Sequence, residues 1–232
     1  MNMTVRYKHA HSPHSVVGAH AALSKIFVDI RPDSLMDVGC GTGTWLKAAN
    51  QLGVFDLHGI DAIDIFSTEC PQASFSKLDL TKSFNLGRRY GVVLCLEVAE
   101  HLNVEYASVL VQSLVTHAPR VIFSAACPGQ PGQQHVNCQW PDYWQALFNK
   151  HGFVCDDSIR WLIWRDKQIE PWYRQNVFSA VHAPTIAGQE PRIAPVIHPD
   201  MLPVMFGLSR YVPSKLLPGL RWLRSMAEQV LG

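Results

Sequence analysis

Two carboxylates and an imidazole stand close together in the segment LCLEVAEHLN, residues 94–103. Glu97, Glu100 and His101 follow an apolar run that is typical of a buried strand. Their spacing places all three on one face if the chain turns helical directly after that strand. Side chains of these types can contact a ligand, take up a proton near neutral pH, or bind a metal ion.

A glycine-rich segment, DVGCGTGTW at residues 37–45, predicts a ligand-binding turn between a strand and a helix. Gly39, Gly41 and Gly43 let the backbone turn tightly and come close to a ligand. A loop for nicotinamide dinucleotides would carry a further glycine at position 44, where this chain has Thr44. The pattern therefore favours a ligand without a pyrophosphate.

Acidic residues come at or near the ends of the first three predicted strands, at Asp37, Asp61 and Asp79. A carboxylate at position 61 can accept hydrogen bonds from both hydroxyls of a ribose, and one at position 79 can accept from an adenine amino group. A cationic ligand fits three acids better than a ligand with two phosphates does. The sequence thus predicts that the ligand is an adenosine that carries a positively charged sulfonium.

Short apolar runs alternate with helical patterns, which predicts an α/β fold with a doubly wound, mostly parallel sheet and helices on both faces. The ligand crevice of such a sheet lies at the carboxyl ends of its strands. We predict strands at 34–39, 55–61, 73–80, 91–97 and 120–126, and helices at 15–30, 44–52 and 104–117.

Beyond residue 126 the alternation breaks. A turn-rich loop at 127–141 precedes a helix at 142–151 and two closing strands within 152–157 and 176–183. We divide the chain into an N-terminal lid and helix (1–33), a core domain (34–183) and a proline-punctuated extension (184–232) that ends in a helix at 220–231. Tyr7, His9, His11 and His14 are the lid residues, with a tail as the alternative.

These motifs resemble those of the class I S-adenosylmethionine-dependent methyltransferases over roughly residues 34–182. The resemblance implies seven strands with the last one antiparallel, a Rossmann-like methyltransferase fold. It also implies which residues bind the cofactor. The methionine end would lie on the segment from Asp37 to Gly43, the ribose on Asp61 and the adenine on Asp79; the full set is Asp37, Gly39, Cys40, Gly41, Gly43, Asp61, Ala62, Asp79, Leu80 and Glu97.

Three interpretations of the carboxylate–histidine cluster stay open. In the first, Glu97 contacts the cofactor, Glu100 favours a helix N-terminus and His101 packs. In the second, His101 or His135 is a catalytic base for a hydroxyl. In the third, E-x-x-E-H resembles the metal-binding run of the small-RNA 3′-terminal 2′-O-methyltransferases and the ubiquinone-pathway O-methyltransferases, and a divalent metal would be bound by Glu97, Glu100, His101 and His135.

The loop at 127–141 resembles that of a bacterial subfamily of these enzymes, which carries LEVAEHL and PGQ-G-HVN-QWP-YW motifs and a later W…WYRQN segment. Members usually have glutamate where this chain has Cys138, so a carboxylate role there is in doubt. The loop offers an apolar wall with hydrogen-bonding groups for an acceptor. We predict Asn137, Gln139, Trp140, Tyr143 and Trp144 for one side of it, and Trp164, Trp172, Tyr173 and Arg174 for the other.

Composition limits the partners. The net charge is +1 with no basic block, which disfavours nucleic acid, and no apolar run is long enough for a membrane span. Six cysteines without a C-x-x-C pair, and no signal-peptide pattern, predict reduced thiols in the cytoplasm. An apolar stripe in the predicted last helix, at Trp222, Leu223, Met226 and Val230, suits docking on the domain or a homodimer.

The sequence therefore predicts an O-methyltransferase that uses S-adenosylmethionine on a small polyhydroxylated acceptor, a sugar or a sugar-bearing metabolite. The alternatives are a metal-dependent 2′-O-methyltransferase of RNA ends and a methyltransferase-like binding subunit without catalysis. The intact glycine turn and strand-end acids weigh against the last alternative.

Overall fold

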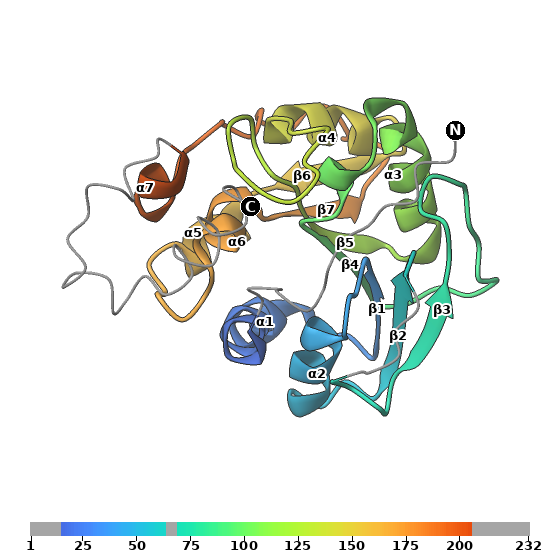
Figure 1. Cartoon of the computed structure of the whole chain (residues 1–232). Helices are drawn as coiled ribbons and strands as arrows, with labels where there is room; N and C mark the ends of the chain where they lie inside the picture. The colour runs from blue at the N-terminus through green and yellow to red at the C-terminus, as the bar shows by residue number, and fades with distance from the viewer. Residues whose placement is uncertain (1–14, 64–68, 206–232) are drawn as a thin grey trace.

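The computed structural model describes residues 15–63 and 69–205. A seven-stranded sheet runs through this part of the chain in the order β3-β2-β1-β4-β5-β7-β6, and only β7 is antiparallel to its neighbours (Figure 1). This confirms the predicted fold class. The strands are β1 (Ser34–Val38), β2 (Asp56–Asp61), β3 (Ser74–Lys77), β4 (Val92–Leu96), β5 (Arg120–Ser124), β6 (Phe153–Asp156) and β7 (Phe178–His182).

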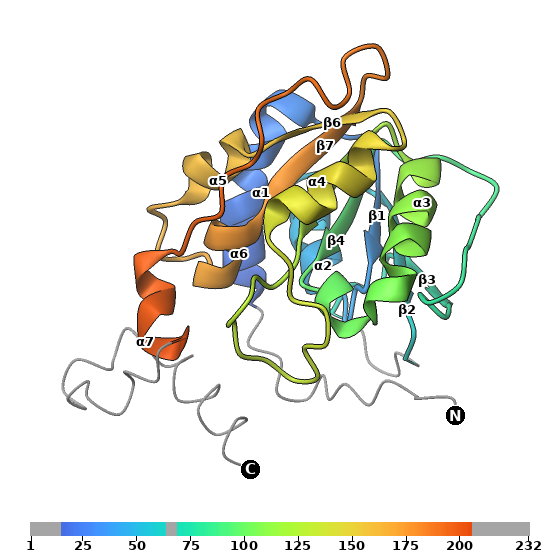
Figure 2. The same ribbon diagram turned by 90° about the horizontal axis from the view of Figure 1, so that it is seen from above.

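Helices cover both faces of the sheet. Seen from above (Figure 2), α1, α2, α5 and α6 lie on one side, and α3 and α4 lie on the other. The α-helices are α1 (Val16–Ile30), α2 (Thr44–Gln51), α3 (Ala107–His117), α4 (Pro141–Asn149), α5 (Ser158–Ile163), α6 (Pro171–Asn176) and α7 (Leu202–Met205). Short 3₁₀ helices are η2 (Ala99–His101), η3 (Val104–Tyr106) and η4 (Pro199–Met201).

The central strand β4 shows why the sheet is buried on both faces. Val92, Leu94 and Leu96 pack in the core under α1 and α2, whereas Val93 and Cys95 pack in the core under α3 and α4. Alternate side chains of a strand point to opposite faces, so a continuous apolar run is what a doubly covered strand requires. The same burial leaves only the strand ends free to carry polar side chains.

Two local elements differ from the sequence-based expectation. The chain after β4 does not enter an α-helix but makes the single 3₁₀ turn η2, so Glu97 lies outside any helix. Strand β3 ends at Lys77, two residues before Asp79, because the Asp79 carboxylate accepts hydrogen bonds from the backbone N–H and the hydroxyl of Thr81 and closes a turn.

Some expectations lie outside the described residues. These are the N-terminal lid with Tyr7, His9, His11 and His14, and the terminal helix at 220–231 with its apolar stripe. The division into three regions stays a prediction. Among the described helices, none is both long and apolar enough to cross a membrane.

Residues 184–198 form a segment that crosses α4, and hydrogen bonds to Glu190 hold this segment in place. One carboxylate oxygen of Glu190 accepts hydrogen bonds from Gln145 Nε2 at 3.1 Å and from the Cys155 N–H at 3.1 Å, and the Asn149 side chain donates to it as well. Burial by itself raises the pKa of Glu190, but these hydrogen bonds outweigh burial and lower the pKa to about 2.

We predict that Glu190→Ala lowers the melting temperature by roughly 2–4 °C at neutral pH, because about 1 kcal/mol of hydrogen bonding to a charged group is lost. The folded-state pKa lies below the ordinary value of 4.5, so this contribution is present above about pH 4.5 and disappears as the pH falls toward 2. Thermal unfolding of both proteins between neutral pH and about pH 3 tests this. The exposed Glu105→Ala is the control, and a wild-type-to-variant difference that stays constant across the range contradicts the assignment.

Candidate active site

The glycine-rich turn joins β1 to α2 in left-handed backbone conformations. Gly39 has φ +79°, which L side chains rarely adopt. A Cβ atom at this position would lie 2.3 Å from Val98 Cγ2, so the turn also needs glycine to let the chain after β4 pack against it. The turn is thereby pressed against the start of the segment that carries Glu97, Glu100 and His101.

Two of the strand-end acids lie in this turn and beside it. Asp61 is anchored by the backbone, since its oxygens accept from the Gly41 N–H at 2.9 Å and the Ile63 N–H at 3.1 Å. Asp37 is fully enclosed, and its Oδ2 atom has no hydrogen-bond partner among the described residues. Burial, and then the charge of Asp61, raise the pKa of Asp37 to about 8.

A cleft of about 960 Å³, solvent at its mouth included, opens along the carboxyl ends of β1, β2 and β4. This volume suits a ligand of the size of S-adenosylmethionine. Of the ten predicted cofactor residues, only Gly43 is absent from its lining; Gly43 is the N-cap residue of α2. The cleft is lined by Asp37, Gly39, Cys40, Gly41, Asp61, Ala62, Asp79, Leu80 and Glu97, with further contributions from Trp45, His101 and Tyr173.

Glu97 reaches the cleft in a strained conformation, with φ +55°. Its carboxylate accepts hydrogen bonds from Gln130 Nε2 at 2.8 Å and Asn176 Nδ2 at 3.1 Å. Burial raises the pKa of Glu97, and the bonds from Asn176, Ser124 and Gln130 partly offset that rise. These hydrogen bonds therefore hold the Glu97 carboxylate in one position at the cleft.

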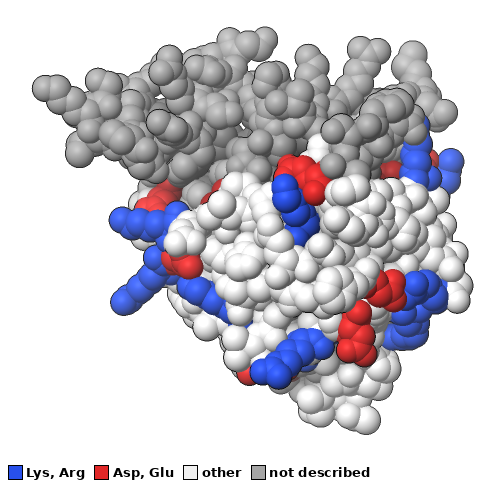
Figure 3. Space-filling model, turned by 90° about the horizontal axis from the view of Figure 1, so that it is seen from below, with Lys and Arg blue, Asp and Glu red and all other residues white. Residues whose placement is uncertain are grey.

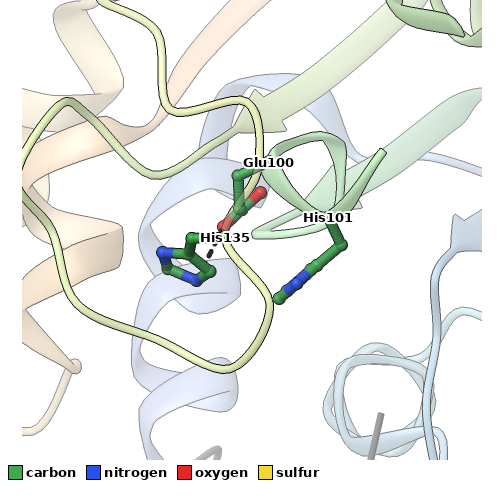
Figure 4. A group of neighbouring side chains, drawn as sticks. All are labelled: Glu100, His101 and His135. Carbon is green, nitrogen blue, oxygen red and sulfur yellow. Dashed lines mark ion pairs between the residues drawn. The ribbon is translucent and has the colours of Figure 1, made fainter. Parts of the chain in front are cut away.

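Glu100, His101 and His135 converge next to the cleft (Figure 4). Each offers a ligand atom, and these three atoms lie within 4.8 Å of one another. His135 Nε2 is 4.0 Å from Glu100 Oε1, and the two imidazole rings meet edge to face with centroids 5.1 Å apart. Of the four residues predicted for a metal, the structure thus groups three and places the Glu97 carboxylate with amide donors instead.

Glu100 is completely buried, and neither of its carboxylate oxygens makes a hydrogen bond of regular geometry with a described residue. Burial, and then repulsion from Glu97, raise the pKa of Glu100 well above its ordinary value, and the backbone N–H groups of Glu100 and Ala126 only partly offset this. An ionised carboxylate buried in this way costs free energy unless a cation lies close to it or the carboxylate takes up a proton.

The loop after β5 fixes His135. Its Nδ1 atom is 3.0 Å from the Gln130 carbonyl oxygen, so Nδ1 carries the hydrogen and the lone pair is on Nε2, which faces Glu100. Gly132 makes room for the ring, because a Cβ atom there would lie 2.1 Å from Nε2. Burial lowers the pKa of His135, which favours the neutral imidazole.

Several residues predicted for the acceptor wall have structural roles. Trp144 is buried and packs on Phe123 with ring centroids 5.1 Å apart, and Trp172 is also buried. Arg174 donates to Asp200 and to the carbonyl oxygens of Trp164 and Ile169. Gln139, Trp140 and Trp144 border a separate small cavity. Packing accounts for Trp144 and Trp172, and hydrogen bonding accounts for Arg174, whereas the acceptor wall as a whole stays a prediction.

The sequence-based prediction missed Gln130 and Asn176 as polar partners of Glu97. The signal was available, since both lie in motifs singled out for the acceptor, PGQ and WYRQN. It also missed Trp45, whose indole N–H donates to the Tyr173 hydroxyl at 3.3 Å across the cleft.

We predict that Gly39→Ala weakens S-adenosylhomocysteine binding by more than about tenfold, because the added methyl group must displace Val98 and distort the turn. Isothermal titration calorimetry measures this. Gly53→Ala is the matched control, since Gly53 also has a left-handed backbone, φ +90°, but nothing lies within 4 Å of its Cβ position. Equal affinity of the two variants would contradict the role of the close approach.

Comparison with known proteins agrees with this geometry. The sequence matches the family described as "Methyltransferase domain" (Methyltransf_23) over residues 10–165, about two thirds of the chain. A search of curated proteins found no match.

Solved structures share the fold at low identity. DesVI of Streptomyces venezuelae is 16% identical, with a TM-score of 0.55 over 71% of this chain and 92% of that one. The sugar N-methyltransferase KedS8 of Streptoalloteichus is 16% identical, with a TM-score of 0.58 over 75% and 91%. The magnesium protoporphyrin IX methyltransferase of Synechocystis, with bound S-adenosylhomocysteine, is 21% identical, with a TM-score of 0.51 over 72% and 84%. The chain therefore belongs to the methyltransferase domain family and is a class I enzyme that uses S-adenosylmethionine.

Proposed function

We propose that this methyltransferase transfers the methyl group to a hydroxyl oxygen of a small polyhydroxylated acceptor, a sugar or a sugar-bearing metabolite. The observation that carries the proposal is the cluster of Glu100, His101 and His135 beside the cofactor cleft. A hydroxyl must lose its proton as it attacks, and this cluster supplies groups that can assist that loss.

The cofactor takes the whole length of the cleft in this proposal. The segment from Asp37 to Gly43 binds the methionine end, Asp61 with Ala62 the ribose, and Asp79 with Leu80 the adenine. The anchoring of Asp61 by the Gly41 and Ile63 N–H groups supports this, because a ribose needs a carboxylate in a fixed position.

The proposed methyl transfer is a displacement at the methyl carbon. The hydroxyl oxygen forms a bond to the methyl carbon while the carbon–sulfur bond breaks, and sulfur keeps the bonding pair and becomes neutral. The hydroxyl proton leaves to His135 or His101, directly or with the help of a metal. Placement of the oxygen in line with the carbon–sulfur bond supplies much of the rate.

The cluster fits a divalent metal. Glu100 is a buried carboxylate that makes no hydrogen bond of regular geometry with a described residue, and His135 is a neutral imidazole whose Nε2 lone pair is directed at it. The other ring nitrogen of His135 donates to a carbonyl, as is usual for a histidine ligand. Two imidazoles and a carboxylate suit manganese, iron, cobalt or zinc, and such an ion would lower the pKa of an acceptor hydroxyl.

Surface properties of the described residues support a small acceptor. Val136, next to His135 in the sequence, and Val104, three residues after His101, are 53% and 54% exposed, which offers apolar contact to the carbon face of a sugar. On the face seen in Figure 3, lysines and arginines alternate with acids and are separated by neutral surface. The described residues on that face form no basic stripe of the kind that a long nucleic acid requires.

We predict that a screen with methyl-labelled S-adenosylmethionine over nucleotide sugars, glycosides and short RNAs yields labelled product with a sugar-containing small molecule. Mass spectrometry then locates the methyl group on oxygen. Labelling of RNA ends alone, or of nitrogen, would replace the proposed acceptor class while leaving the cofactor assignment in place.

We predict that the purified protein contains a divalent transition metal in about a one-to-one ratio, and that Glu100→Ala and His135→Ala lose it. Elemental analysis and a metal-binding titration measure this without an acceptor. The control is His58→Ala, which removes a histidine that bonds to Ser76 on β3. Turnover that is unaffected by EDTA and by Glu100→Ala would exclude the metal and leave the histidines as direct bases, and full turnover of His135→Ala would remove that residue from both mechanisms.

A further inference from the structure

Two segments far apart in the chain meet at the carboxylate of Glu97. Gln130 Nε2 donates to Oε2 at 2.8 Å, and Asn176 Nδ2 donates to Oε1 at 3.1 Å. Asn176 Nδ2 is also 2.9 Å from Gln130 Oε1, so the two amides contact each other as well as the acid. We call Gln130, Gln175 and Asn176 the amide clamp.

The clamp is itself held in place. Gln175 Nε2 donates to Asn176 Oδ1 at 3.1 Å, and Gln175 Oε1 accepts from the His198 N–H at 2.8 Å. All three clamp residues are buried. A buried network in which each member has a partner fixes one arrangement of its side chains, because any other arrangement leaves polar atoms unsatisfied.

The backbone of Glu97 adds to this constraint. The Glu97 N–H donates to the hydroxyl of Ser124 at 3.1 Å and to its carbonyl oxygen at 3.0 Å. These bonds hold the residue at φ +55°, which is costly for a side chain of this kind. Strain kept in place by surrounding contacts is found preferentially at functional sites.

The order of the strands places Glu97 with respect to the cofactor. Along the sheet edge, β3, β2, β1 and β4 bring Asp79, Asp61, Asp37 and Glu97 to the cleft in that order. In the proposed placement the adenosine lies over Asp79 and Asp61, and the reacting end lies toward β4 and His101. Glu97 is therefore the acid at the end of the cleft where the methyl group leaves.

The charge of the ligand changes at that end. S-adenosylmethionine carries a sulfonium, and S-adenosylhomocysteine has a neutral thioether at the same place. A carboxylate fixed beside this position attracts the first and has no such attraction for the second.

We infer that Gln130 and Asn176 are positioning residues that hold the Glu97 carboxylate toward the sulfonium, and that they make the cleft prefer the cofactor over the demethylated product. This inference rests on the proposed cofactor placement and is independent of the acceptor. A contact to the ground-state charge strengthens cofactor binding and favours product release; because the charge on sulfur is lost as the methyl group leaves, the contact does not accelerate the chemical step.

The test is calorimetry with S-adenosylmethionine and S-adenosylhomocysteine on wild type, Asn176→Ala and Gln130→Ala. We expect each variant to bind S-adenosylmethionine about tenfold more weakly, while its affinity for S-adenosylhomocysteine changes less than about twofold. Asn50→Ala is the matched control, since it removes a half-buried amide at the end of α2 that donates to the Val54 carbonyl oxygen. Circular dichroism and melting temperatures establish that each variant is folded.

Glu97→Gln separates positioning from a general structural effect. It should lower the preference for S-adenosylmethionine to the same extent, and adding Asn176→Ala to it should change the preference no further. An unchanged ratio of the two affinities in both amide variants, or a full effect of Asn176→Ala in the Glu97→Gln background, overturns the inference. Failure of wild type to bind either ligand overturns the cofactor placement itself, and Gln130→Ser and Asn176→Ser replace any alanine variant that does not fold.

Discussion

Four carboxylates face one cleft in this enzyme, and the structure around the cleft is arranged to keep them there. Mutual repulsion and loss of water both act against such a group of acids. Each acid is accommodated differently: Asp61 by backbone N–H groups, Asp79 by Thr81 and Lys82 near the surface, and Glu97 by buried amides. Asp37 has the fewest compensating contacts, and its raised pKa reflects this. In the proposed placement a cationic cofactor would relieve the remaining repulsion, so the cleft suits a positively charged ligand.

The sheet could be predicted from sequence because its strands carry a simple signal. A doubly covered strand must be apolar throughout, and the first residue that breaks the run marks the edge where ligands bind. Asp37 and Asp61 followed this rule, and both line the cleft. Asp79 did as well, although its strand ends earlier, because a turn held by its own side chain cannot be told from a strand end by periodicity.

The site was less accessible to prediction where its contacts join distant segments. Glu100 and His135 could be paired only through a family resemblance, and the amides around Glu97 lay in motifs quoted for the acceptor region without being given a role of their own. Trp144 shows the same difficulty from the other side: tryptophan suits both sugar binding and a core, and only its packing on Phe123 decides between them. Residue type states what a side chain can do, whereas three-dimensional neighbours determine which of these it does.

The reversed direction of β7 has a consequence for how the enzyme forms during synthesis. Because β7 runs antiparallel to β5, its first residues lie at the edge where β4 and β5 end, and Asn176 immediately before it arrives beside Glu97. The strands that carry the glycine turn, the acids and both histidines are translated well before this point. A nascent chain can therefore assemble β1 to β5 while Glu97 still lacks its hydrogen bond from Asn176, and that bond forms only once β7 inserts between β5 and β6.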